Sequence, residues 1–174
     1  KKTFVRIQEA LQHGKGTVSL RGWVYRERGN AQIKFIVLRD ATNIIQCVIK
    51  REDVGDAKFK GADKLQIEAS LELEGELHKD IRAPTGYEVQ VKRFSVIGPS
   101  EAFPIQKDQS PEFLLDHRHL WLRSRKMTAI LKIRHTVFGA IHEYFRKEGF
   151  YEYQSPVFQS VQCEGGSTLF SVDY

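Results

Sequence analysis

The chain has few of the residues that mark secreted, zinc-binding or membrane-spanning proteins. Its two cysteines, Cys47 and Cys163, lie far apart and have no Cys or His partner at metal-ligand spacing. This excludes a disulfide framework and a zinc site of the Cys-x-x-Cys type, so we expect both thiols to be reduced. No apolar run approaches the ~20 residues of a membrane helix, and the N-terminal residues lack the pattern of a secretory signal. We therefore expect a cytoplasmic protein with no membrane partner.

The composition also lacks the polar excess that is typical of disordered chains. Hydrophobic residues make up 41% of the 174 residues and charged residues 28%, which is ordinary for a globular protein. The net charge of +5 favours a polyanionic partner such as nucleic acid, because neutralised phosphates release counterions. Acidic residues are interspersed with the basic ones, however, so charge alone leaves binding to nucleic acid undecided.

The sequence from Thr17 to Ile97 has the alternation of apolar and polar residues that is typical of strands. Gly29-Asn30 predicts a hairpin turn after the first strand. We expect strands at 17–25, 32–39, 44–49, 65–77 and 87–96, with a short helix within 53–61. Five antiparallel strands with a helix between the third and fourth predict a closed β barrel of the oligonucleotide-binding type, an OB-fold. Gly22 and Gly75 would mark sharp bends of its strands.

The remaining residues predict a linker and the beginning of a second domain. Residues 98–112 contain three prolines and no sustained period, which is typical of a linker. Apolar residues then recur at spacings of three and four from Arg125 to Glu148, which predicts a long helix capped by Gly149. Tyr151 to Ser155 is expected to form a short strand that ends at Pro156. The expected domains are therefore 1–97 and 113–174, joined by the linker 98–112.

A barrel of this type binds single-stranded nucleic acid by stacking bases on aromatic side chains while polar side chains contact the base edges. Phe35 is the candidate for stacking, and Gln46 offers a donor and an acceptor to a pyrimidine. Four basic residues would follow the phosphates: Arg21, Arg26, Arg28 and Lys34. The alternative is that Phe35 belongs to the barrel core and Gln46 to a solvated face, and the pattern alone leaves it open.

Several segments together resemble a known family. They are Gly22 to Val24, Phe35 to Asp40, Ile45 to Val48, Leu115 to Leu120 and Gly149 to Pro156. In this order they resemble class II aminoacyl-tRNA synthetases of the aspartate, asparagine and lysine subgroup, over nearly all residues from Val18 onward. Glu164 to Phe170 is most similar to the asparaginyl-tRNA synthetases of the archaeal and eukaryotic type. The resemblance implies an OB-fold anticodon-binding domain followed by the start of an α+β catalytic domain.

The resemblance also implies roles for residues in the barrel. Phe35 and Gln46 match the positions that stack and contact the central uridine of the anticodon in this subgroup. Arg26 and Glu76 are the further anticodon candidates. In relatives an acid in or after this strand contacts the anticodon, and Glu76 is the residue chosen for that position. The alternative for Glu76 is a place in the solvated face formed with Glu72 and Glu74.

In the second domain, Gly149 and Pro156 match motif 1 of class II synthetases, whose role in the family is dimerisation. Glu164 matches an acid that contacts the α-ammonium group of the bound amino acid, and a carboxylate between flexible residues could make such charge-assisted bonds. The alternative for Glu164 is a surface position beside a Gly-Gly turn.

The implied function is that of an asparagine–tRNA ligase, a homodimer that uses ATP and Mg²⁺ to activate asparagine and transfers it to its tRNA. Motifs 2 and 3, which bind ATP and the metal ion in the family, have no counterpart in the sequence. We therefore expect a fragment that is inactive alone and contains neither catalytic residues nor a metal site. The alternatives are an aspartate–tRNA ligase, charging one tRNA or both, and a non-catalytic RNA-binding module.

Overall fold

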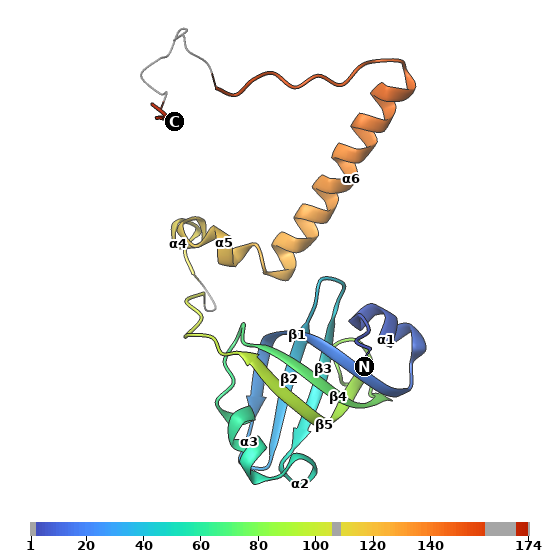
Figure 1. The fold of residues 1–174 in the computed structure, drawn as a ribbon, viewed down its shortest axis with the longest axis vertical. Coiled ribbons are helices and arrows are strands. Elements are labelled where there is room, and N and C mark those ends of the chain that lie inside the picture. The colour runs from blue at the N-terminus through green and yellow to red at the C-terminus, as the bar shows by residue number, and fades with distance from the viewer. Residues whose placement is uncertain (1–2, 106–108, 159–169, 174) are drawn as a thin grey trace. The chain divides into compact units, whose positions relative to one another are not determined.

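Alternating side chains build the barrel that the sequence predicts for the first half of the chain. The computed structural model describes residues 3–105, 109–158 and 170–173. Its strands are β1 (Gly16–Gly29), β2 (Ile33–Arg39), β3 (Ile44–Lys50), β4 (Ser70–Lys79) and β5 (Tyr87–Gly98). They pair in the order β1-β2-β3-β5-β4 and close into a barrel (Figure 1). Contacts divide the chain into two units, Lys1–Asp108 and Gln109–Tyr174, and the barrel belongs to the first.

One pair of neighbouring strands in the barrel, which we call the parallel seam, is parallel. β3 and β5 run in the same direction, whereas the other four pairs are antiparallel. The expectation of five antiparallel strands was therefore wrong at this seam. Strand directions cannot alternate all the way around a closed ring that has an odd number of strands, so at least one neighbouring pair must be parallel. This seam brings Gln46 and Glu88 into register.

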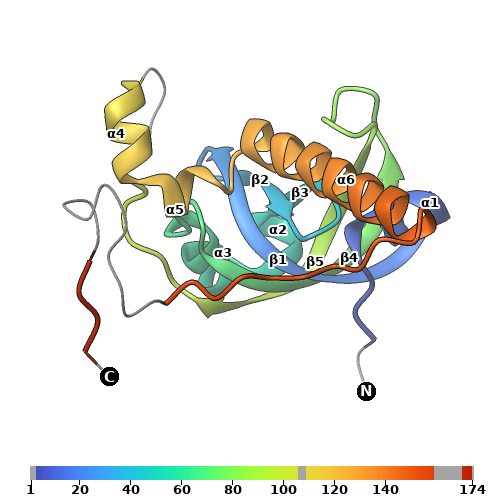
Figure 2. The same ribbon diagram turned by 90° about the horizontal axis from the view of Figure 1, so that it is seen from above.

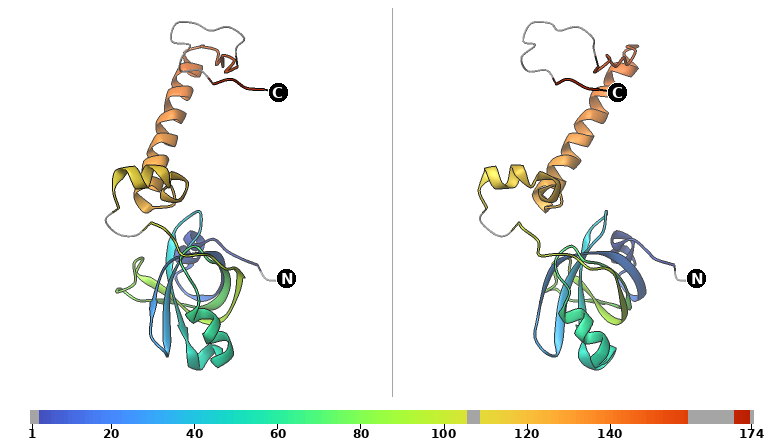
Figure 3. Two further views of the ribbon diagram at one scale, coloured as in Figure 1. Left: turned by 90° about the vertical axis from the view of Figure 1, so that its left-hand side faces the viewer. Right: turned by 60° about the vertical axis from the view of Figure 1, so that its left-hand side comes forward.

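Short helices cover the two ends of the barrel. α1 (Ile7–His13) lies at one end, and α2 (Arg51–Val54) and α3 (Asp56–Asp63) lie at the other (Figures 1 and 3). The helix expected within 53–61 is thus confirmed, but it is divided at Gly55, whose φ of +81° interrupts the helix. The sequence did not predict α1, because seven residues are too few to establish a helical period.

The fourth strand begins later than its pattern indicates. Strand structure was expected from Leu65, but β4 begins at Ser70. The preceding residues form a turn in which Glu68 has a φ of +70°. Leu65 and Ala69 are nevertheless buried, so this turn shows the same apolar spacing as a strand. The expected start was therefore wrong because burial, and not strand pairing, produced the pattern.

Asp40 fixes the turn between β2 and β3 and the beginning of α1. Its carboxylate accepts hydrogen bonds from the backbone N–H groups of Thr42 (2.7 Å), Asn43 (2.9 Å) and Ile7 (2.8 Å). Partial burial by itself would raise the pKa of Asp40, but these hydrogen bonds outweigh it and hold the pKa below its usual value. The folded state therefore favours the ionised carboxylate.

Replacing Asp40 with alanine should lower the free energy of unfolding by about 1–3 kcal/mol near neutral pH, because backbone donors lose a charged acceptor. Since the folded pKa is depressed, the contribution is present above the unfolded pKa of about 3.9 and is lost as the pH falls through the folded pKa. Thermal unfolding of both proteins at pH 7 and pH 3 measures this difference. A gap in melting temperature that persists undiminished at pH 3 would contradict the assignment.

The described residues of the second unit form three helices: α4 (Pro111–Asp116), α5 (Arg118–Trp121) and α6 (Arg125–Lys147). The sequence predicted α6, which appears as the long helix in Figure 2. The Ser124 side chain caps its start by accepting from the N–H of Met127, and Gly149 follows its end with a φ of +84°. Among the described residues, no helix is long and apolar enough to cross a membrane.

The strand expected at Tyr151 to Ser155 is not found. These residues have no regular secondary structure. A strand is defined by hydrogen bonds to a neighbour, and the described part of the second unit offers no other strand for pairing. The sequence pattern was therefore insufficient to predict a strand here.

Candidate nucleic-acid interface

The pairing register arranges outward-facing side chains in two adjacent rows that cross all five strands. We call them the Phe35 row and the Gln46 row. The Phe35 row consists of Arg28, Phe35, Val48, Gln90 and Glu76. The Gln46 row consists of Arg26, Val37, Gln46, Glu88 and His78. All four residues that the sequence analysis assigned to anticodon binding thus lie in these two rows.

Phe35 lies on the outer face of β2. It is half-buried, whereas its neighbours Ile36 and Leu38 are fully buried inside the barrel. The guanidinium carbon of Arg28 lies 5.1 Å from the centre of the Phe35 ring, within the range of a cation–π contact. The interpretation of Phe35 as a core residue was therefore wrong. Its aromatic ring is available to stack on a base beside a positive charge.

Gln46 lies on the outer face of β3, but it is not a solvated side chain. Only 7% of its surface is exposed, and its Nε2 donates a hydrogen bond to Oε2 of Glu88 at 3.0 Å. Phe35 is paired with Val48, so Phe35 and Gln46 are diagonal neighbours, a relation that places Cβ atoms about 7–8 Å apart. A ring and an amide at this separation can contact the same or adjacent bases.

Of the four basic residues that were expected to follow the phosphates, only some lie in the two rows on the outer face of the barrel. Arg26 and Arg28 are exposed members of the two rows, as expected. Lys34 is only 7% exposed and points to the inner face, where its Nζ lies 2.5 Å from Oε2 of Glu27. The expectation that Lys34 follows phosphates was therefore wrong, because its charge is already paired beneath the surface. Arg21 is paired with Glu72 and lies in neither row.

Glu76 lies at the far end of the Phe35 row. Its carboxylate accepts a hydrogen bond from the hydroxyl of Thr17 on β1. Along this row, Val48 and Gln90 lie between Phe35 and Glu76, so the two side chains are not neighbours in it.

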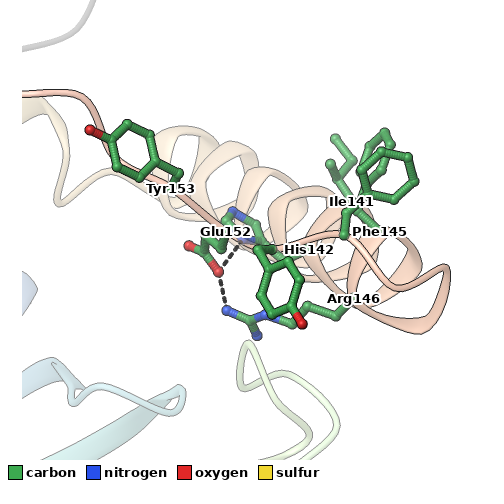
Figure 4. A pocket seen from close by; sticks show the side chains of 8 residues that line it. Ile141, His142, Phe145, Arg146, Glu152 and Tyr153 are labelled. Carbon is green, nitrogen blue, oxygen red and sulfur yellow. Dashed lines mark hydrogen bonds and ion pairs between the residues drawn. The ribbon is translucent and has the colours of Figure 1, made fainter.

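A pocket of about 220 Å³ lies where the chain leaves α6 (Figure 4). Oε2 of Glu152 lies 3.2 Å from Nδ1 of His142 and also pairs with the guanidinium of Arg146. Hydrogen bonds from Arg146 and then His142 hold the pKa of the Glu152 carboxyl below its usual value. These contacts tie the segment after Gly149 to the last turns of the helix. Glu164 lies outside the described residues.

Two family models match the chain. The OB-fold nucleic acid binding domain matches residues 18–97, and the class II tRNA synthetases of the D, K and N group match residues 110–174. The first match covers the barrel that carries both rows, and the second covers α4 to α6 and the residues that follow. Residues 110–174 thus have the sequence characteristics of the class II tRNA synthetases.

Curated proteins and solved structures are similar to this chain over most of its length. The asparagine–tRNA ligase of Thermoplasma acidophilum is 47% identical over 157 residues, which are 90% of this chain and 37% of the relative. A crystal structure of asparaginyl-tRNA synthetase from Pyrococcus horikoshii, complexed with asparaginyl-adenylate, matches with a TM-score of 0.82 and 38% identity. The match covers 100% of this chain and 41% of the Pyrococcus horikoshii chain. The chain thus spans about two fifths of the length of these relatives.

An aspartyl enzyme shares the fold at lower identity. The aspartyl tRNA synthetase of Entamoeba histolytica matches with a TM-score of 0.77 and 20% identity, over 89% of this chain and 39% of that one. This likeness supports the fold alone.

The class II synthetases as a family use ATP and Mg²⁺. In residues 3–105, 109–158 and 170–173 of this chain, no group of three or more His, Cys, Asp or Glu side chains is arranged to hold a metal ion.

Proposed function

We propose that this chain belongs to an asparagine–tRNA ligase. Residues 1–97 form its anticodon-binding domain, residues 98–112 a linker, and residues 113–174 the beginning of its catalytic domain. The observation that carries the proposal is the pair of adjacent rows on the barrel, which places an aromatic ring, an oriented amide and two arginines on one face. Identities of 47% and 38% to asparagine enzymes support asparagine as the amino acid.

Five members of the two rows have a chemical role in this proposal. Phe35 stacks on the central base of the anticodon, and Gln46 hydrogen-bonds to the edge of that base. Arg26 and Arg28 neutralise the neighbouring phosphates, which makes binding sensitive to salt. Glu76, on β4, accepts hydrogen bonds from another nucleotide of the loop.

The second unit contributes to a homodimer. The exposed apolar side chains of α6 form a face that would be costly to leave in water. They include Leu131, Ile133, Val137, Phe138 and Ile141, each more than 40% exposed. Gly149 and Pro156 bound the segment that follows this helix. Glu164 is proposed to contact the amino group of asparagine, on the sequence resemblance alone.

Amino-acid-dependent exchange of pyrophosphate into ATP by the full-length protein tests the proposed function. Exchange should depend on asparagine, because the bound amino acid attacks the α-phosphate of ATP and releases pyrophosphate reversibly. Aspartate at the same concentration should give at least about a hundredfold less exchange, since an added charge without a partner in the pocket is strongly disfavoured. Exchange with aspartate alone would make the protein an aspartate–tRNA ligase. Salt-sensitive RNA binding without any exchange would make it an RNA-binding module.

A further inference from the structure

β1 contains one extra residue, Tyr25, directly before its first member of the two rows. Val24 pairs with Leu38 of β2. Arg26 pairs with Val37, the adjacent residue of β2, so two steps along β1 match one step along β2. This irregularity is a β-bulge, in which the extra residue has no partner in the ladder. Bulges are frequent beside functional sites, where they reorient a side chain, and here the side chain that follows is that of Arg26.

The ring of Tyr25 lies beside two guanidinium groups. The central guanidinium carbons of Arg26 and Arg39 each lie 5.5 Å from the centre of this ring. Both distances are within the range of a cation–π contact. Arg39 lies on the same outer face of β2 as Phe35, because the two are four residues apart in a strand. The ring therefore connects Arg26 to a cation of the neighbouring strand.

Glu68 in turn holds Arg39. Nη2 of Arg39 donates a hydrogen bond to Oε2 of Glu68 at 2.9 Å. The two side chains are only 17% and 11% exposed, so solvent ions screen this pair less than a surface pair. The carboxylate fixes the guanidinium by a charge-assisted bond and offsets its repulsion of the nearby Arg26.

The backbone of Glu68 has an unusual conformation that is held from β1. Its φ is +70°, and no other non-glycine residue in the described part of the chain has a positive φ. The N–H of Glu68 donates to the carbonyl of Val24 at 2.7 Å, and the N–H of Val24 donates to the carbonyl of Ala69 at 2.9 Å. Strain of this kind persists where the surroundings impose it, often at functional sites. The turn is thus bonded to β1 at the residue directly before the bulge.

We propose that Tyr25, Arg39 and Glu68 are positioning residues for RNA binding, which together hold the guanidinium of Arg26 in the orientation that contacts a phosphate. This inference rests on the proposed function of the barrel as the anticodon-binding domain. A free arginine side chain adopts many rotamers, and fixing it before the RNA arrives lowers the entropic cost of binding. Because a phosphate contact carries no sequence information, the three residues should affect affinity and salt dependence for any anticodon sequence.

The test measures binding of one anticodon stem-loop by the full-length protein, as wild type, Arg26→Gln, Tyr25→Leu and the double variant. Dissociation constants are measured from about 50 to 200 mM salt, where each phosphate contact contributes about 0.7 to 0.9 to the slope of log K against log salt. Arg26→Gln should lower the slope by about this amount. Tyr25→Leu should lower it in the same direction and weaken binding about 2- to 5-fold, the contribution of one cation–π contact. In the Arg26→Gln background, Tyr25→Leu should have no further effect, because the side chain through which it acts is absent.

Two further variants test the other links. Tyr25→Phe retains the ring and should recover the affinity and slope that Tyr25→Leu loses. Glu68→Gln should bind about twofold or more weakly than Glu74→Gln, since loss of the carboxylate releases Arg39 and with it the ring. Glu74→Gln is the matched control, because it removes the same charge from another Arg–Glu pair of the barrel, formed with Arg93 outside both rows.

The outcomes separate this inference from the proposed function. An equal loss from Tyr25→Leu with and without Arg26, or a loss with an unchanged slope, would mean that Tyr25 contacts the RNA itself or only supports the barrel, and the inference would be overturned. If Arg26→Gln changes neither affinity nor slope, Arg26 contacts no phosphate, and that role fails together with the inference. A wild type that does not bind the stem-loop would refute the proposed function itself.

Discussion

Replacing Phe35 with alanine should weaken binding of the anticodon stem-loop by the full-length protein about 10- to 100-fold. Stacking of a base on an aromatic ring contributes about 1–3 kcal/mol, and each 1.4 kcal/mol corresponds to a factor of ten in the dissociation constant. Pyrophosphate exchange without tRNA should not change, because it does not involve the barrel.

The control for this prediction is Trp23→Ala. Trp23 is also an aromatic residue on the outside of β1, 44% exposed, and it lies in neither row. Its removal should leave the dissociation constant within about twofold of the wild type, because a side chain that does not contact the ligand contributes little to binding. Equal losses in both variants would indicate a general effect on the barrel, and unchanged binding in Phe35→Ala would remove the stacking role.

The barrel could be predicted from the sequence because its strands and turns are indicated by patterns of neighbouring residues. Strand positions followed from alternation, and the hairpin after β1 followed from Gly29-Asn30. The position of Phe35 on the opposite face from Ile36 and Leu38 followed from the same period of two. These inferences need only neighbouring residues.

What the sequence did not predict depends on pairing between distant residues. The parallel pairing of β3 with β5 follows from closure of the barrel. Without knowledge of this pairing, the sequence does not indicate that Glu88 is the hydrogen-bond partner of Gln46. Lys34 was expected to follow the phosphates because of its charge, although the period of two puts it on the same face as Ile36 and Leu38. Its ion pair with Glu27 of β1 could not be predicted from neighbouring residues. The long helix α6 was predicted by its period, but the segment after it has no pairing partner among the described residues.

The glycine in the middle of β4 is expected to be one of the most sensitive backbone positions of the barrel. A Cβ at Gly75 would collide with the backbone carbonyl of Gln90 on β5, and backbone cannot rotate away as a flexible side chain can. Gly75→Ala should therefore lower the free energy of unfolding by about 3 kcal/mol, at the upper end of overpacking costs. The same substitution at Gly61, in α3, places its Cβ in open space and should stabilise the protein by up to about 1 kcal/mol.

Thermal unfolding of the two alanine variants under one set of conditions makes this comparison. Gly75→Ala should unfold about 10 °C or more below the wild type, and Gly61→Ala at or slightly above it. Because Gln90 belongs to the Phe35 row, separation of β4 from β5 would also displace Gln90 and Glu76 from Phe35. The Gly75 variant should then bind the anticodon stem-loop more weakly even below its melting temperature. If it binds and unfolds as the Gly61 variant does, β4 and β5 do not approach as closely as described.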